Sequence, residues 1–132
     1  MNIESTKTSI ANSQKAVYDY LMDLNNVESL LPEGKFTEWK GSYDECSFKM
    51  QGFSLTLKKE SSTPNSEIKL ISGEDSPIDF DLSIFIEEKG EVSSEAFLIC
   101  EARVNTFLKM MIEKPLTSLF NHMSEKLSRV SL

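Results

Sequence analysis

The chain has 132 residues, 39% of them apolar and 27% charged, a composition that is typical of a globular protein and excludes an intrinsically disordered one. Its 21 acidic and 14 basic residues give a net charge of −7, and the basic residues are scattered along the chain. Nucleic acids and anionic membrane surfaces are bound mainly through clustered positive charge, so we expect neither as a partner. The length predicts a single domain over residues 1–132.

The start of the chain and its two cysteines indicate the cellular compartment. Residues 1–10 lack the apolar run of a secretory signal, and no stretch reaches the roughly eighteen apolar residues of a membrane span. Cys46 and Cys100 lie far apart, each inside an apolar segment with strand character. We therefore expect a cytoplasmic protein with two buried, reduced thiols; a disulfide between them is the alternative.

The N-terminal residues predict a strand followed by two short helices. Residues 2–10 are rich in Thr, Ser and Ile, which favour a strand, and Ser13 is a suitable helix N-cap. The next apolar residues have the spacing of one helical face, and they are Val17, Tyr20, Leu21 and Leu24. Asn25-Asn26 is expected to interrupt this helix. Residues 27–31 then predict a second short turn, which Pro32 ends.

Residues 36–104 change to a period of two, which predicts an antiparallel sheet. Turn residues divide this region into strands over residues 36–40, 43–50, 53–60, 67–71, 78–87 and 92–104. Within 78–87 the apolar residues share one face and the polar residues, among them Asp79 and Asp81, share the other. Such a strand is packed on one side and solvated on the other. Strand 92–104 is less regular, because Phe97 and Ile99 lie on its outer face, either as a contact patch or as ordinary surface residues.

The C-terminal segment predicts one long helix from Asn105, a suitable N-cap, to about Val130. Its apolar residues fall within an arc of roughly 120°, the width of a core-facing stripe. Pro115 lies inside the stripe, and burial of the stripe is expected to offset the roughly 3 kcal/mol that an interior proline costs, so we expect one kinked helix. Three residues before the proline lie off the stripe, and they either line the mouth of a cavity or cap one end of the core: Phe107, Met110 and Met111.

Few residues carry recognisable chemistry. The sequence has no Gly-rich phosphate loop, no zinc-type Cys/His spacing and no nucleophile elbow, so we assign no catalytic residue, no metal site and no cofactor. His122, the only histidine, lies at the edge of the helical stripe and is either a structural imidazole or a general base. Asp79 and Asp81 fit either solvated carboxylates or a weak divalent-ion contact. The candidates for polar handles in a cavity are Trp39, Tyr43 and Arg103.

The order of the predicted elements resembles the START-like (SRPBCC) superfamily, which has the helix-grip fold of the birch pollen allergen. Three segments are similar to it: Leu30-Leu31-Pro32 after the paired helices, residues 46–53, where a strand leads through a glycine to the next, and Glu113-Lys114-Pro115-Leu116, as in the terminal helix of small bacterial members. The resemblance implies an α+β helix-grip fold, with a curved antiparallel sheet of about seven strands around a long C-terminal helix and two short helices after the first strand.

In that superfamily the cavity between sheet and helix commonly binds lipids, sterols, polyketides or aromatic compounds. The resemblance therefore implies that this chain binds a small apolar ligand there. The six methionines of the chain either make such a cavity adaptable or fill gaps in an ordinary core. The residues expected to line the cavity are Phe48, Met50, Leu55, Phe80, Leu82, Ile84, Leu98, Met111, Ile112, Leu116, Leu119, Phe120 and Met123.

Two alternative functions remain open. The first is a protein-interaction or homodimerisation module that holds no ligand and recognises its partner through Phe85, Phe97 and Ile99. The second is an enzyme of the cyclase or dehydratase type, which some members of the superfamily are. It would need an acid or base with a perturbed pKa inside the cavity, and Glu38 and His122 are the candidates.

Overall fold

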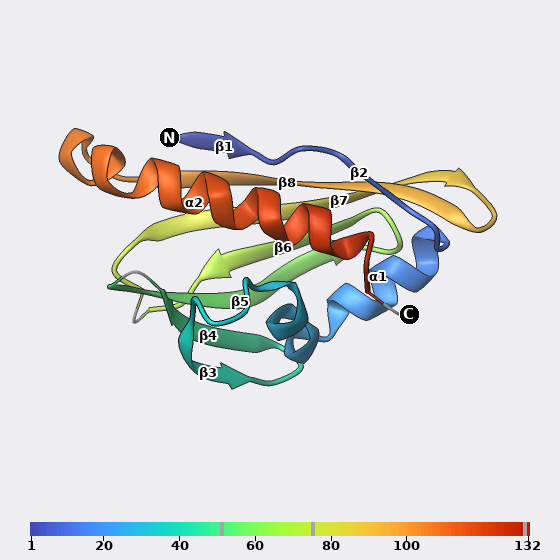
Figure 1. Cartoon of the computed structure of the whole chain (residues 1–132), viewed down its shortest axis with the longest axis horizontal. Helices are drawn as coiled ribbons and strands as arrows, with labels where there is room; N and C mark the ends of the chain where they lie inside the picture. Colours follow the sequence, from blue (N-terminus) through green and yellow to red (C-terminus); the bar gives the residue numbers. More distant parts are fainter. Residues whose placement is uncertain (51, 75, 131) are drawn as a thin grey trace.

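The computed structural model describes residues 1–50, 52–74, 76–130 and 132, and in it helix α2 (Thr106–Leu127) lies across one face of an antiparallel sheet (Figure 1). The eight strands among these residues are β1 (Asn2–Glu4), β2 (Thr8–Ile10), β3 (Thr37–Gly41), β4 (Glu45–Met50), β5 (Phe53–Thr63), β6 (Glu67–Ser72), β7 (Asp79–Gly90) and β8 (Ser93–Arg103). Their order is β1-β8-β7-β6-β5-β4-β3, and β2 also pairs with β8. The predicted α+β helix-grip arrangement is confirmed, with one strand more than expected. Gln51, in a segment that carries the resemblance, lies outside the described residues.

The extra strand arises at the N-terminus, where residues 2–10 form two strands instead of the one predicted. β1 pairs with residues 99–101 of β8, and β2 pairs with residues 94–96. Between them, the Leu98 amide donates a hydrogen bond to the Ser5 hydroxyl at 2.8 Å, and the Ser5 amide donates to the Leu98 carbonyl at 2.8 Å. The Ser5 hydroxyl oxygen therefore takes the place of a backbone acceptor opposite Leu98. This interrupts the N-terminal strand at Ser5, although the segment stays beside β8.

The two predicted short helices are α1 (Gln14–Met22) and the 3-10 helix η1 (Leu24–Leu30). The Ser13 hydroxyl accepts a hydrogen bond from the Ala16 amide at 3.1 Å, which confirms the predicted N-cap. The break between the helices lies at Asp23 and not at Asn25-Asn26. Asp23 has an extended backbone, and its carboxylate accepts the Asn25 amide at 3.0 Å, so it caps the second helix.

The strongly alternating pair β7 and β8 forms the middle of the core. The inward side chains of β7 and β8 are buried, as predicted: Phe80, Leu82, Ile84, Ile86, Ala96, Leu98, Cys100 and Ala102. The predicted strands 78–87 and 92–104 left residues 88–91 for the turn between them, which is wrong, because β7 extends to Gly90. Gly90 still pairs with Ser93, because the register shifts between Glu88 and Gly90 and a bulge adds a residue to the ladder.

Helix α2 begins at the predicted N-cap, where the Asn105 side-chain oxygen accepts the Leu108 amide at 2.9 Å. The helix runs unbroken through Pro115 and ends at Leu127, earlier than the predicted end near Val130. The predicted stripe faces the core, and its buried members are Ile112, Leu116, Leu119, Phe120, Met123 and Leu127.

A set of hydrogen bonds joins the C-terminal half of α2 to the N-terminal edge of the sheet. The Ser124 hydroxyl donates to the Thr6 carbonyl at 2.7 Å and lies 3.0 Å from the Thr8 hydroxyl oxygen. The Thr6 amide donates to the Asn121 side-chain oxygen at 2.9 Å. Ser124 is fully buried, so its two contacts are shielded from water. Together with the exposed Thr6–Asn121 bond they fix the orientation of the helix on the sheet.

Candidate functional site

An apolar pocket of about 220 Å³ lies at the start of α2, where this helix meets the turns at one end of the sheet. Its walls come from three places in the chain: Gly52 and Phe53 at the β4–β5 turn, Pro77 and Ile78 at the entry to β7, and Leu108, Met111, Ile112 and Pro115 of α2. None of these lining residues has an ionisable side chain. The described walls therefore favour an apolar molecule.

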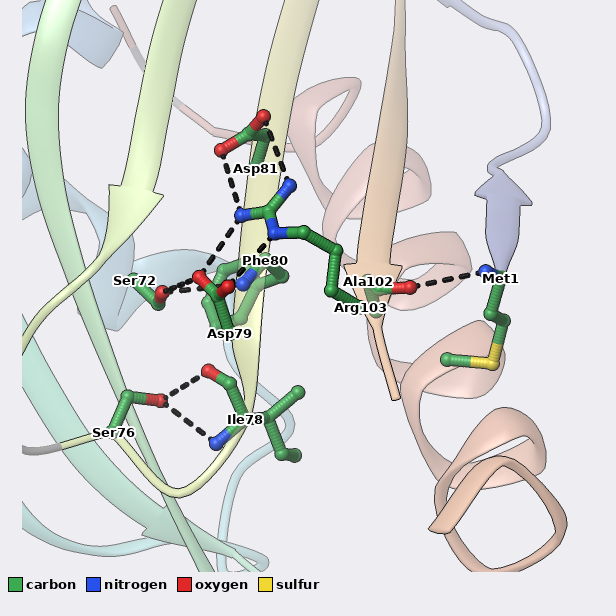
Figure 2. A network of polar contacts seen from close by, with 9 residues as sticks. All are labelled: Met1, Ser72, Ser76, Ile78, Asp79, Phe80, Asp81, Ala102 and Arg103. Carbon is green, nitrogen blue, oxygen red and sulfur yellow. Dashed lines mark hydrogen bonds and ion pairs between the residues drawn. The ribbon is translucent and has the colours of Figure 1, made fainter. Parts of the chain in front are cut away.

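Local turn chemistry positions two of the walls. Gly52 has a φ of +83°, a left-handed conformation that is unstrained only without a Cβ, and Phe53 follows it directly into β5. On the opposite side, the Ser76 hydroxyl donates to the Ile78 carbonyl at 2.8 Å and accepts from the Ile78 amide at 3.4 Å (Figure 2). These bonds hold Ile78 at the entry to β7.

The first turns of α2 expose large apolar side chains beside the pocket. The exposed fraction is 71% for Phe107, 79% for Met110 and 60% for Met111. The interpretation that the three cap one end of the core is therefore wrong. Met111 instead lines the pocket, and Phe107 and Met110 lie next to it on the same helix. Exposed apolar groups of this size commonly mark a contact surface.

The residues predicted to line a cavity lie in two settings. Those that are at most 6% exposed belong to the hydrophobic core: Phe48, Met50, Leu55, Phe80, Leu82, Ile84, Leu98, Ile112, Leu116, Leu119, Phe120 and Met123. Met111 lies outside that core, and Met111 and Ile112 are the members of the predicted set that line the apolar pocket. The sequence reasoning missed the other walls. The sequence held two signals for these walls. Leu108 lies one helical turn before Ile112, and Gly52 and Pro77 are turn-forming residues.

Asp79 and Asp81 have a partner in Arg103, whose side chain points between them on the outer face of the sheet (Figure 2). Arg103 Nε and Nη2 donate to the two oxygens of Asp79 at 2.8 and 2.9 Å, and Nη1 and Nη2 donate to Asp81 at 3.3 and 3.2 Å. These bonds from Arg103 lower the pKa of Asp79 below its ordinary value. Across the described ranges, no group of three His, Cys, Asp or Glu residues is arranged to hold a metal ion.

The other proposed polar handles also lie away from the apolar pocket. Trp39 stacks on the buried Phe48, with ring centroids 6.3 Å apart. Tyr43 is exposed, and the Lys59 ammonium lies 3.5 Å from its ring centroid while donating to the Met22 carbonyl at 2.7 Å. Tyr43 and Lys59 therefore connect the β3–β4 turn to the end of α1.

The two acid–base candidates do not meet in the pocket. Glu38 is exposed on the outer edge strand β3, where it has a φ of +56°. His122 is half-buried on α2, and its Nε2 atom is buried without a hydrogen-bond partner among the described residues. Neither residue lines the apolar pocket.

The two cysteines are buried and free, as predicted. Burial, together with the nearby charge of Glu45, raises the pKa of Cys46 to about 12, and burial likewise raises the pKa of Cys100 to about 12. Both thiols are therefore protonated at neutral pH, which makes them poor nucleophiles.

Neighbouring side chains partly cover the apolar patch that Phe85, Phe97 and Ile99 form on the outer face of the sheet. Phe85 and Phe97 stack with ring centroids 5.1 Å apart, and the Lys7 ammonium lies 5.0 Å from the Phe97 ring centroid. Both aromatic rings and Ile99 are half-buried. Recognition of a partner or a second copy through this patch stays a prediction.

No helix in the described part of the chain is long and apolar enough to cross a membrane.

Solved structures similar to this chain cover nearly its whole length. A START superfamily protein from Mycobacterium smegmatis has a TM-score of 0.68 at 11% identity, and the match covers 97% of this chain and 94% of that one. Norcoclaurine synthase from Thalictrum flavum, in complex with dopamine and hydroxybenzaldehyde, has a TM-score of 0.67 at 14% identity, over 100% of this chain and 88% of that one. This chain has the START-like fold.

The START-like fold is shared by proteins with different activities. The di-domain ARO/CYC BexL from the BE-7585A biosynthetic pathway has a TM-score of 0.66 at 11% identity, and the match covers 98% of this chain but 45% of that one. No protein-family model matches this chain, and no curated protein sequence matches it either. Identities this low establish a shared fold, and function has to be argued from the site itself.

Proposed function

We propose that the chain binds a small apolar ligand, lipid-like or aromatic, in the pocket between the first turns of α2 and the adjoining end of the sheet. The observation that carries this proposal is the set of apolar walls around about 220 Å³ of open space, among them the exposed Met111. Apolar surface of this kind is stabilised when a ligand removes it from water.

The size of the pocket bears on what it holds. Sites for drug-sized ligands have volumes of roughly 300–1,000 Å³, so this pocket takes a small aromatic ring or one end of a longer chain. A larger ligand would have to displace side chains toward the core, where Ile112 and then Leu116 follow along α2. Met50 and Met123 in that core are unbranched and adapt to such displacement more readily than branched residues.

We propose binding without catalysis. An acid–base reaction needs an ionisable group within hydrogen-bond reach of the substrate. The described walls provide none, Glu38 is on the outer edge of the sheet, and His122 is not among the lining residues. A measurable conversion of an aromatic or polyketide-like substrate would contradict this part of the proposal.

Two adjacent methionines of α2 provide a matched test. Met111→Lys places a charge on the pocket wall, whereas Met110→Lys places the same charge on the same helix outside it. We expect Met111→Lys to weaken binding of an uncharged fluorescent apolar probe, N-phenyl-1-naphthylamine, by at least about tenfold, because the ammonium must be desolvated. Met110→Lys is expected to change the affinity less than about twofold.

Competition with unlabelled fatty acids and small aromatic compounds then identifies the class of ligand. Native mass spectrometry of the purified chain tests whether a molecule is carried along. Equal losses in the two lysine variants, or a wild-type chain that binds no apolar compound of either class, would refute the proposal.

A further inference from the structure

A second hollow, of about 550 Å³, lies over β3, β4 and β5. It is lined by Glu38, Trp39, Lys40, Ser47, Phe48, Lys49, Ser54 and Thr56. Along β4 and β5 its polar members alternate with buried residues such as Cys46 and Leu55, so they lie on the outer face of the sheet. The hollow is therefore on the side of the sheet opposite the core.

Strand pairing brings two lysines to the same group of short hydroxyl side chains. Lys40 is opposite Ser47, and Ser47 is opposite Thr56. One row further on the same face, Lys49 is opposite Ser54. Diagonal neighbours on one face are roughly 7–8 Å apart, so both long, flexible ammonium groups reach the space above the three hydroxyls. The short serine and threonine side chains leave that space open.

The edge strand beside the hollow is held in an unusual conformation. Glu38 has a φ of +56°, and the β3–β4 register shifts between Thr37 and Lys40. This bulge lets Trp39 pack on the buried side against Phe48. Gly41 makes room for the indole, since a Cβ there would lie 2.8 Å from Trp39 Cζ2. Left-handed non-glycine residues and bulges that surrounding packing holds in place are frequent at binding sites.

The charges at the hollow suggest the chemistry of a ligand. Neither Lys40 nor Lys49 forms an ion pair with any described residue, whereas Lys7 and Arg103 on the same sheet face pair with carboxylates. In a chain with a net charge of −7, two cations therefore face an open hollow. Glu38 at the rim adds one carboxylate, which accepts hydrogen bonds from hydroxyl groups.

We propose that this hollow binds a small phosphorylated polyol, such as a sugar phosphate. The two ammonium groups and the three hydroxyls donate to the phosphate oxygens, and the Glu38 carboxylate accepts from the hydroxyls of the polyol. The volume falls in the range of small-molecule sites. This site is independent of the apolar pocket, because the two are lined by different residues on different parts of the molecule.

The test follows backbone amide NMR signals of the whole chain during titration with ribose 5-phosphate. Ribose and sodium sulfate, at matched ionic strength, are the comparison compounds. We expect saturable shifts confined to β3, β4 and β5 with ribose 5-phosphate, and at least about tenfold weaker binding of the other two. Absence of saturation with ribose 5-phosphate overturns the proposal, and equal affinity for sulfate overturns the assignment of a polyol ligand.

Variants separate this site from diffuse charge attraction. Lys40→Gln with Lys49→Gln is expected to weaken ribose 5-phosphate binding at least about tenfold, whereas Lys69→Gln with Lys89→Gln removes the same charge elsewhere and leaves the affinity within about twofold. Ser47→Leu fills the hollow with both lysines retained and is also expected to prevent binding. Equal losses in the two double variants, or full affinity in a folded Ser47→Leu chain, refute the proposal.

Discussion

The two halves of α2, before and after Pro115, have opposite environments although they form one helix. After the proline, the helix is buried along its stripe and hydrogen-bonded to the N-terminal strands through Ser124 and Asn121. Before it, Phe107 and Met110 face solvent and the helix borders an open pocket. One element of this fold therefore holds the core together at one end and borders open apolar space at the other.

The largest expected difference between the halves is in packing. Leu116→Ala, in the buried half, should lower the free energy of unfolding by about 2–5 kcal/mol, because it removes a fully buried side chain and leaves a cavity. Met110→Ala, in the exposed half, should change it by less than about 0.5 kcal/mol. Urea denaturation of the two variants measures both values. Similar losses in the two would contradict the division of the helix.

The hydrogen bonds of Ser124 should have the next largest effect. Ser124→Ala leaves the Thr6 carbonyl and the Thr8 hydroxyl without this partner, which should cost about 1–3 kcal/mol. Ser118, exposed on the same helix, provides the matched control, and Ser118→Ala should stay within about 0.5 kcal/mol of the wild type. A neutral Ser124→Ala would mean that apolar packing alone fixes the C-terminal half.

Replacing the proline should make the two halves more alike. In Pro115→Ala the new amide can donate to the Met111 carbonyl, four residues earlier, a bond that proline cannot make. A proline inside a helix costs roughly 3 kcal/mol, but it also restricts the unfolded chain, which offsets much of that cost. We therefore expect the variant to gain only about 1 kcal/mol of stability. Hydrogen exchange should slow for the amides of residues 108–114. Faster exchange there would show that the proline stabilises the exposed half.

The smallest expected effect is a pH dependence on the outer face of the sheet, away from both halves. Arg103 lowers the pKa of Asp79 in the folded chain. The ion pair therefore stabilises the folded chain fully at a pH above the pKa of an unfolded aspartate, about 3.9. This stabilisation is lost as the pH falls through the lowered pKa of Asp79. The melting temperature of Asp79→Asn should therefore lie slightly below that of the wild type at neutral pH. The gap should narrow in acid. A gap that is independent of pH would rule out the ion pair as its cause.

Periodicity predicted most of the fold, because burial on one side of a strand or helix leaves a direct trace in the sequence. The stripe of α2 and the inward faces of β7 and β8 follow from it. The ends of elements were harder, since they depend on partners distant in the chain. The Ser5 hydroxyl interrupts the first strand only because Leu98 lies opposite it, and Gly90 stays in the ladder because of Ser93.

The candidate site was predicted only in part. Alternation identifies which side chains face inward, but it does not tell whether they leave space between them. The residues expected around a cavity therefore lie mostly in the packed core, and Met111 and Ile112 alone among them also border the apolar pocket. The remaining walls come from turns that only the three-dimensional structure brings to the same end of the sheet.

The interruptions in β1–β2 and β3 also affect how this chain behaves at high concentration. An unbroken strand at the border of a sheet offers a row of free amides and carbonyls to which another molecule can add its own strand. Here one border is divided at Ser5 and the other is bent at Glu38. Both borders are therefore poor templates for amyloid-like growth.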